Sequence, residues 1–327
     1  PLFTNLLDEL KVDYEDSAMS FSVFSQKSNI EYNGTNLNTL FTQRKNIFKP
    51  RFIKMILEIL RFNKESLELL EDKKNITLGE FLSKKNYSNF FSDHYILPMG
   101  SAIWSSDIET MLKFPAKFFV TFFHNHGMLS VNNRPQWLTI SGGSKNYVDK
   151  LCRPFRDKIL LNSKIKSVQR TKNKVKIIHE KIDLFDHVFF ACHSNQSLKL
   201  LSDATTDEKN ILQSLPYVSN DVFLHTDASC MPKNKLAWAA WNYNIDKQPN
   251  EPITLTYNMN ILQNLRTKED VLVTLNPNQA LAKNKIIKKL NYSHPKFSLE
   301  GIAAQKKYNT ISGRNNTSFA GAYWGNG

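Results

Sequence analysis

The stretch QWLTISGGSKNYVDKL, residues 136–151, predicts a short strand, a Gly-Gly turn and a helix in direct succession. Trp137, Leu138 and Ile140 favour the strand, and Gly142 and Gly143 permit a tight turn into the helix. Turns of this kind bring the backbone close to phosphates and cofactors. Yet G-x-G-x-x-G, the dinucleotide-binding fingerprint, occurs nowhere in the 327 residues. The turn therefore has to be interpreted from the segments around it.

The segment before this turn is predicted to be mostly helical, over residues 50–127. Pro50 suits the first position of a long helix, and Pro115 opens another that carries a stripe of phenylalanines. Capping-box spacing occurs at Thr77–Glu80 and at Ser106–Glu109. The first of these helices repeats apolar residues at helical spacing: Phe52, Met55, Ile56, Ile59 and Leu60. Earlier still, residues 20–24 and 30–34 predict a hairpin that turns at Asn33-Gly34.

The segment after the turn predicts strands. KILLNSKIKSVQR (158–170), VKIIHE (175–180) and FDHVFFAC (185–192) alternate or run apolar, and Ser194 and Thr205 are placed to cap the next two helices. A second strand-rich block spans about 217–275, with consecutive apolar residues typical of a covered sheet.

Composition excludes several classes of protein. Hydrophobic residues are 41% and aromatic residues 12% of the chain, which favours a packed core over disorder. No apolar run reaches the roughly 18 residues of a membrane-spanning helix, and no signal peptide is visible. Cys152, Cys192 and Cys230 form no C-x-x-C pair, which argues against a zinc site and for a reducing compartment. The cytoplasm is the expected location, with a membrane-peripheral one as the alternative.

The net charge of +13 raises the question of a nucleic-acid partner. Nucleic-acid binders usually gather Lys, Arg and aromatic residues on one element. Here the lysines are scattered in pairs such as Lys84-Lys85 and Lys288-Lys289, beside Asn and Ile. We therefore expect no specific nucleic-acid partner, and a general attraction to anionic ligands or membrane surfaces instead.

Two histidines, His124 and His126, invite a metal-site interpretation. The phenylalanines before them have helical spacing, however, and residues i and i+2 of a helix do not face each other. We favour a helix end capped by Gly127, with no metal site. A Ser-His-Asp site is equally unsupported, because Ser144 lacks the G-x-S-x-G context. Catalytic residues remain unassigned.

The order strand, Gly-Gly, helix, ILLNSKIKSV, hairpin and DHVFFA resembles the flavin-containing amine oxidase and phytoene desaturase superfamily. Blocks such as PMGSAIWS, RPQWLTISGGSKNYV, LHTD and AAWNY, in this order, are similar to its predicted NAD/FAD-binding protein subgroup. The closing SFAGAYWGNG resembles the family's last flavin-contacting motif. The resemblance implies FAD as cofactor, with contacts from Gly142, Gly143, Ser144, Ile165, Ala191, Gly321, Ala322, Tyr323, Gly325 and Gly327.

The resemblance also implies a fold. It is an α/β, Rossmann-like FAD/NAD(P)-binding fold of glutathione-reductase type, truncated, with a mixed helical and β-sheet substrate domain. We expect a mainly helical substrate part at 1–135 and a returning FAD-domain part at 136–200. A strand-rich substrate part would follow at 201–312 and the last FAD-binding segment at 313–327. Family members begin with the G-x-G-x-x-G turn and continue past the last glycine found here, so we expect a fragment that binds FAD weakly.

The implied activity is that of an FAD-dependent oxidoreductase. Family amine oxidases commonly have an acidic residue where Ala322 stands, and no aromatic cage for an amine is visible, so an amine substrate is not expected. Trp104, His126 and Trp137 are expected to line an apolar substrate pocket. An apolar pocket and a basic surface favour an acyl-lipid or other small-molecule substrate over a polar amine. The alternative is a flavin- or lipid-binding protein of the same fold without turnover.

Overall fold

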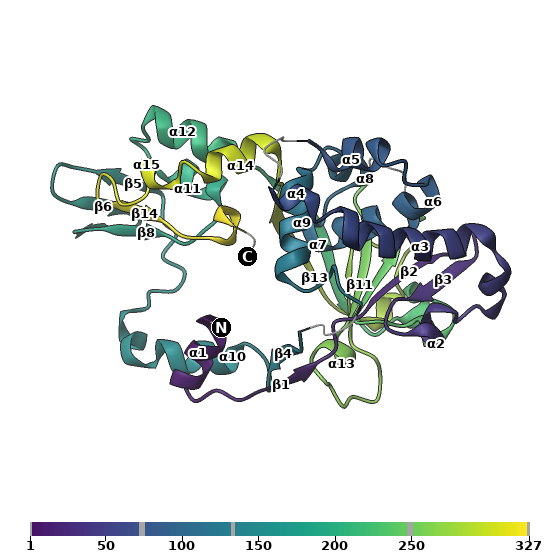
Figure 1. The fold of residues 1–327 in the computed structure, drawn as a ribbon. Coiled ribbons are helices and arrows are strands. Elements are labelled where there is room, and N and C mark those ends of the chain that lie inside the picture. The colour runs from purple at the N-terminus through teal and green to yellow at the C-terminus, as the bar shows by residue number, and fades with distance from the viewer. Residues whose placement is uncertain (1, 72–75, 132–134, 247–250, 326–327) are drawn as a thin grey trace. The chain divides into compact units, whose positions relative to one another are not determined.

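The computed structural model describes residues 2–71, 76–131, 135–246 and 251–325 (Figure 1). The chain divides into two compact units: unit 1 comprises residues 1–156 and 220–292, and unit 2 comprises residues 157–219 and 293–327. The domain boundaries expected at 135/136, 200/201 and 312/313 do not coincide with this division. Strands β9 (Tyr217–His225) and β13 (Ile286–Pro295) each begin in one unit and end in the other.

Unit 1 is built on a seven-stranded sheet with the order β13-β9-β12-β11-β10-β2-β3. The remaining strands are β2 (Phe21–Ser25), β3 (Ile30–Asn33), β10 (Trp241–Asn244), β11 (Thr254–Asn258) and β12 (Leu272–Leu275). Strand β10 pairs parallel with β2, so the sheet joins the N-terminal hairpin to strands more than halfway along the chain. The strands predicted between 217 and 275 are confirmed. Strand β13 was not predicted, because its lysines interrupt the apolar pattern.

The predicted hairpin is confirmed, but its turn lies elsewhere. Ser25 pairs with Ile30, which places the turn at residues 26–29, where Asn29 has a φ of 49°. Gly34 follows β3 instead, and its N–H donates to the carbonyl of Phe21.

Residues 50–127 are mostly helical, as predicted. The helices are α3 (Pro50–Glu65), α4 (Glu68–Glu71), α5 (Leu78–Lys84), α6 (Asn89–Phe91), the π-helical turn η2 (Ser92–Ile96), α7 (Leu97–Trp104), α8 (Ile108–Leu112) and α9 (Ala116–Asn125). In Figure 1 these helices form a layer beside the sheet, and Ala102 of α7 packs against Tyr243 and Leu255. The capping box at Thr77 is confirmed. The one at Ser106 is wrong, because Asp107 caps α8 by accepting from the Thr110 N–H at 2.8 Å.

The predicted apolar face of α3 needs one correction. Phe52 and Met55 are buried and Ile56 and Ile59 are half-buried, but Leu60 is exposed. Glu58 takes its place among the buried residues, and its carboxylate accepts from the backbone N–H of Ser88 at 2.9 Å. A buried carboxylate with a donor fits this face as well as an apolar side chain, which hydrophobic periodicity could not foresee.

A smaller part of unit 1 contains the opening stretch. Strand β4 (Trp137–Ile140) pairs antiparallel with β1 (Tyr14–Ser17), and helix α10 (Lys145–Cys152) lies against α1 (Leu2–Glu9) through an edge-to-face contact of Phe3 with Tyr147. The predicted strand, turn and helix are therefore confirmed. The short elements α2 (Leu37–Leu40), α13 (Met259–Leu262), η1 (Arg44–Phe48), η3 (Arg153–Lys158), η4 (Ala228–Cys230), η5 (Lys235–Ala237) and η6 (Lys283–Lys285) connect the rest.

Unit 2 has two small sheets around one core. Strands β5 (Ser167–Arg170), β6 (Val175–Ile178) and β7 (Ile182–Phe185) form an antiparallel meander, and β8 (Val188–Phe190) pairs parallel with β14 (Thr317–Phe319). The helices are α11 (Ser194–Leu200), α12 (Thr206–Gln213), α14 (Leu299–Gln305) and α15 (Tyr308–Ile311), followed after β14 by η7 (Ala322–Trp324). The core holds Val168, Val175, Phe190, Leu201, Ile211, Leu212, Ala304, Ile311 and Phe319.

Two predictions in unit 2 are wrong in detail. The strand expected at 158–170 begins only at Ser167, because Asn162 and Lys164 have left-handed φ angles of 57° and 47°. Ile165 therefore lies outside the strand and is exposed. Ser194 does not cap α11, since its hydroxyl donates to the carbonyl of Leu215. The box of Thr205 with Glu208 on α12 is confirmed.

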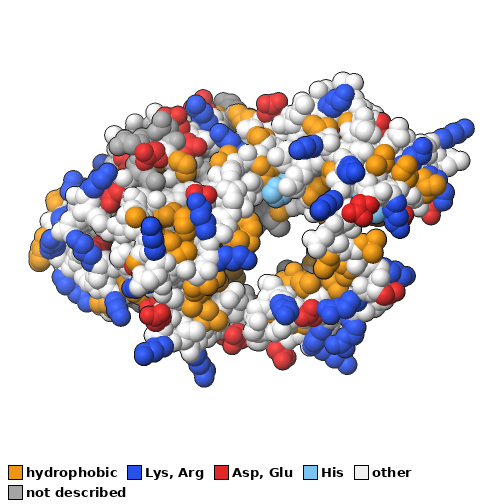
Figure 2. All heavy atoms as spheres, turned by 180° about the vertical axis from the view of Figure 1, so that it is seen from behind, with side chains coloured by type: hydrophobic (Ala, Val, Ile, Leu, Met, Phe, Trp, Pro, Cys, Tyr) orange, Lys and Arg blue, Asp and Glu red, His pale blue; other side chains and the backbone are white. Residues whose placement is uncertain are grey.

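The surface agrees with the scattered lysines of the sequence. In Figure 2, Lys and Arg side chains are spread over the face shown and do not gather on one element. Among the residues that the structure describes, no helix has the length and apolar character needed to cross a bilayer.

Candidate functional site

The Gly-Gly turn after β4 adopts a conformation that requires glycine. Gly142 and Gly143 have φ angles of 72° and 90°, and the Gly143 N–H donates to the Ile140 carbonyl at 2.9 Å. Asn146 holds the turn through its side-chain nitrogen, 2.7 Å from the Ser141 carbonyl, and a Cβ on Gly142 would lie 2.7 Å from that nitrogen. Ser144 leads into α10 without a side-chain cap. The turn is thus an ordered elbow on unit 1.

In unit 2, the structure brings Ala191 together with Gly321. Strands β8 and β14 are parallel with Phe190 opposite Phe319, and the Ala320 N–H donates to the Phe190 carbonyl at 2.8 Å. Ala191 and Gly321 therefore follow neighbouring strands at the same carboxyl edge. Ligands of open α/β sheets bind outside this edge. Ala191, Gly321 and Ala322 are all exposed.

Past this edge the chain turns back on itself. A Cβ on Gly321 would lie 2.4 Å from the ring of Tyr323, so the close approach of that ring requires glycine. Tyr323 is buried, which raises the pKa of its hydroxyl to about 12. It belongs to the core and not to the exposed edge where a cofactor contact was expected. Gly325 ends η7, and the predicted contact Gly327 lies outside the described residues.

Two further residues stand near this edge. The His193 ring stacks on Tyr217 with centroids 4.0 Å apart and an interplanar angle of 12°. Burial, with the nearby Tyr323 and Cys192, raises the pKa of Tyr217 to about 12. Sequence reasoning missed both residues. The only signal for His193 was its position two residues after Ala191, and Tyr217 had none, because the sheet brings it there.

The three residues expected in a substrate pocket form one row of rings in unit 1, joined by Phe122. The ring centroids are 5.1 Å apart from Trp104 to Phe122, 3.9 Å from Phe122 to His126 and 6.1 Å from His126 to Trp137. Trp104 is buried among phenylalanines, whereas Phe122, His126 and Trp137 are half-buried. Only these last three can offer a surface to a ligand.

The histidines have structural hydrogen bonds. His126 Nδ1 lies 2.8 Å from the Phe122 carbonyl, and since that oxygen only accepts, Nδ1 carries the hydrogen. Gly127, with a φ of 65°, ends α9, which confirms the predicted cap. His225 is buried, with Nδ1 accepting from the Asp227 N–H and Nε2 2.7 Å from the Thr274 hydroxyl. Within the described ranges, no three His, Cys, Asp or Glu residues are grouped as metal ligands would be.

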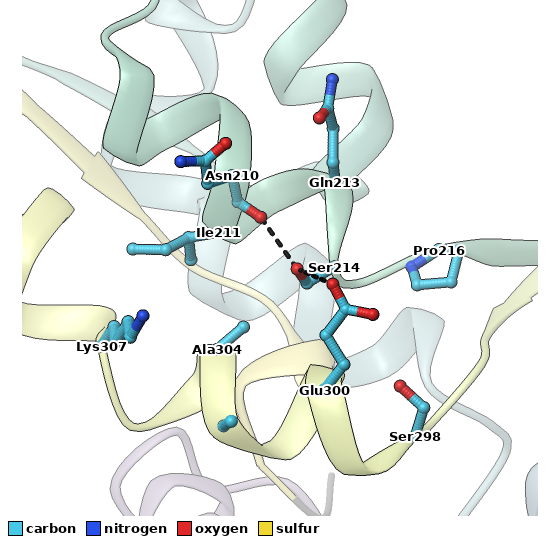
Figure 3. Close-up of a pocket in the computed structure, with 10 residues that line it drawn as sticks. Asn210, Ile211, Gln213, Ser214, Pro216, Ser298, Glu300, Ala304 and Lys307 are labelled. Atoms are coloured by element: carbon cyan, nitrogen blue, oxygen red, sulfur yellow. Dashed lines mark hydrogen bonds between the residues drawn. The ribbon is translucent and has the colours of Figure 1, made fainter.

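A cavity of about 470 Å³ lies between α12 and α14 of unit 2 (Figure 3). The hydroxyl of Ser214, one of the lining residues, lies 2.9 Å from the Asn210 carbonyl and 3.1 Å from a carboxylate oxygen of Glu300. None of the predicted site residues lines this cavity.

A comparison with family models matches residues 1–273 to the flavin containing amine oxidoreductases. The chain belongs to this family. The predicted family, the flavin cofactor and the class of oxidoreductase enzymes are thereby confirmed. No curated protein matches the chain in sequence.

Similar solved structures include the CLA-producing fatty acid isomerase from P. acnes, with 14% identity, a TM-score of 0.64 and coverage of 98% of this chain and 78% of that one. Cyclohexylamine oxidase from Brevibacterium oxydans has 10% identity, a TM-score of 0.62 and coverage of 98% and 79%. Reduced UDP-galactopyranose mutase has 10% identity, a TM-score of 0.63 and coverage of 98% and 76%. At these identities the likeness shows the fold alone, a mixed α/β fold.

The exposed edge of β8 and β14 is chemically suited to a flavin nucleotide. Ala191, Gly321 and Ala322 have no side chain beyond Cβ, so a planar or phosphate-bearing ligand can approach their backbone groups. A G-x-G-x-x-G turn, which would bind the pyrophosphate of the cofactor, does not occur in the sequence. Among the described residues, the carboxyl edge of β8 and β14 therefore has no such turn beside it.

Proposed function

We propose that the chain is an FAD-dependent oxidoreductase that removes hydride from an apolar substrate, with acyl lipids as the substrate class. The observation that carries this proposal is the ring row of Phe122, His126 and Trp137, which offers an apolar, half-buried surface with one polar ring. Ligand pockets are commonly lined in this way, with apolar and aromatic side chains that contact hydrocarbon and a few polar groups that fix orientation.

The proposed cofactor contacts are taken one unit at a time. In a Rossmann-like domain, Ala191, Gly321 and Ala322 would meet FAD at the carboxyl edge of β8 and β14, with Ile165 before β5 near the adenine. In unit 1, the family resemblance alone predicts that Gly142, Gly143 and Ser144 contact the cofactor. Tyr323 would act through the backbone turn that it holds, because its side chain is buried.

Bound flavin supplies the hydride acceptor for this chemistry. The protein's own residues orient the substrate and exclude water. Phe122 and Trp137 offer ring surface to a hydrocarbon chain. His126 donates its Nδ1 hydrogen to the Phe122 carbonyl, so Nε2 is the position of the ring left to accept a hydrogen bond from a substrate hydroxyl or protonated carboxyl.

The solved relatives support the substrate class unevenly. The fatty acid isomerase favours an acyl substrate, whereas cyclohexylamine oxidase favours an amine. Ala322 stands where amine oxidases commonly have an acidic residue, and we therefore favour the acyl class.

The test is anaerobic titration of the FAD-loaded protein with long-chain fatty acids and, separately, with primary amines. Fatty acids should bleach the oxidised flavin band, and amines should not. Bleaching by amines alone would refute the acyl class. His126→Gln should weaken fatty-acid binding, whereas the matched control His124→Gln should not, because His124 is an exposed neighbour outside the row.

The second candidate is a flavin- or lipid-binding protein of the same fold without turnover. Fatty-acid binding without bleaching by any acyl substrate would support it over the enzyme.

A further inference from the structure

The β5–β6–β7 meander of unit 2 has one face that the core does not use. Cross-strand partners point to the same side of a sheet. Lys176 is opposite Leu184, and Ile178 is opposite Ile182. These four residues, with Ser167 and Gln169 opposite them on β5, form what we call the outer face.

The outer face is apolar at its β7 end and open to solvent. The alternate residues Val168 and Val175 are buried in the core of unit 2 and Ile177 packs against it, so the meander already covers that core with its other side. Ile182 and Leu184 remain 61% and 60% exposed. Large contiguous apolar patches on a surface mark interaction sites, whereas single exposed apolar residues do not.

The surroundings of the outer face are basic. Residues 164–186 hold six lysines, at 164, 166, 172, 174, 176 and 181, against three carboxylates, Glu180, Asp183 and Asp186. Two of these carboxylates are already paired, Asp183 with His179 and Lys181, and Asp186 with Lys174. Arg170 points to the other side, where it binds Glu208. Of the six outer-face residues, only Lys176 is charged, so the face itself presents one positive charge and no carboxylate.

We propose that the outer face docks on an anionic lipid surface, with Ile182 and Leu184 entering the interface and Lys176 meeting the headgroups. Apolar side chains ringed by lysines bind such surfaces through area and charge together. Sheets that bind single-stranded RNA use aromatic residues for base stacking, and the outer face has none. A second copy of the chain would place lysines against lysines.

The test measures binding of the chain to vesicles of phosphatidylcholine alone and of phosphatidylcholine with phosphatidylglycerol. Binding should require phosphatidylglycerol and weaken with salt. Lys176→Gln should lower the partition constant about 5-fold, the equivalent of about 1 kcal/mol per lysine. Ile182→Thr/Leu184→Thr should lower it more than about 10-fold, and threonine suits an exposed strand, so the fold should persist. The matched control is Ile287→Thr, an exposed isoleucine beside two lysines on β13, which should bind like the unchanged chain.

Three results would overturn the proposal. They are no binding to phosphatidylglycerol vesicles, equal binding to neutral vesicles, and binding unchanged by the double substitution when circular dichroism shows an intact fold. Light scattering tests whether a second copy of the chain binds the outer face instead. A dimer that the double substitution abolishes would assign the outer face to self-association. None of these measurements depends on flavin or on a substrate, so they stand apart from the proposed function.

Discussion

The replacement Arg170→Met should destabilise unit 2 more than any surface change. Arg170 is bound by Glu208 through two contacts, Nη1 to Oε1 at 2.5 Å and Nη2 to Oε2 at 2.8 Å, and by Asp203 through Nε at 2.9 Å. The side chains of Arg170 and Glu208 are only 5% and 2% exposed. Methionine fills a similar volume but leaves the Glu208 carboxylate buried without its cation.

The expected loss is about 3–5 kcal/mol of unfolding free energy, the usual cost of removing one partner of a buried ion pair. The ion pair of Arg170 with Asp203 adds little to this loss, because Asp203 is partly exposed and solvent screens its charge. Burial by itself would raise the pKa of Glu208, but the hydrogen bonds from Arg170 and Thr205, together with the positive charge of Arg170, outweigh it and hold that pKa below its ordinary 4.5. The contribution of the pair is therefore present above pH 4.5 and lost as the pH falls through the lower folded value.

Urea unfolding followed by circular dichroism measures this loss. The control is Lys174→Met, which breaks the exposed pair with Asp186 and should leave the midpoint nearly unchanged. Arg170→Met/Glu208→Gln should recover at least half of the loss, because no buried charge is then left alone. A loss for Arg170→Met as small as that of the control would refute the argument.

Three further predictions concern stability. His225 is buried as the neutral imidazole, and burial lowers its pKa. Its contribution to stability is therefore present above the unfolded pKa of 6.5 and is lost as the pH falls below that value. Thermal unfolding at successive pH values should show this loss of stability, and His225→Asn should make the pH dependence flatter. Gly143→Ala should cost about 1–2 kcal/mol at a φ of 90°, whereas Gly325→Ala, with extended backbone and open space, should cost little; equal midpoints in urea would contradict this. Thr77→Ala should lower the free energy of unfolding by about 1 kcal/mol, because it removes the N-cap of α5, whereas Ser106→Ala should not, because Asp107 caps α8. Similar losses for the two variants would support the capping box at Ser106 after all.

Local features were the ones that the sequence predicted well. Pro50, the Thr77 box and Gly127 mark helix ends through groups within a few residues, so α3, α5 and α9 were expected where they are. The same holds for the elbow at Gly142 and Gly143, whose φ angles suit glycine alone. Local signals failed where two residues had equal claims, as at Ser106 and Asp107, or where a buried charge such as Glu58 stood on an apolar face.

The sequence by itself determined these helices, the elbow, and the motifs by which the family was predicted. Only the tertiary structure decided which of the predicted site residues meet. Ala191 joins Gly321 because β8 and β14 pair in parallel register, and Trp104, Phe122, His126 and Trp137 form a row because α7, α9 and β4 converge. The outer face of the meander likewise follows from register. Pairing between distant segments depends on how whole faces bury against one core, and no single residue carries that information.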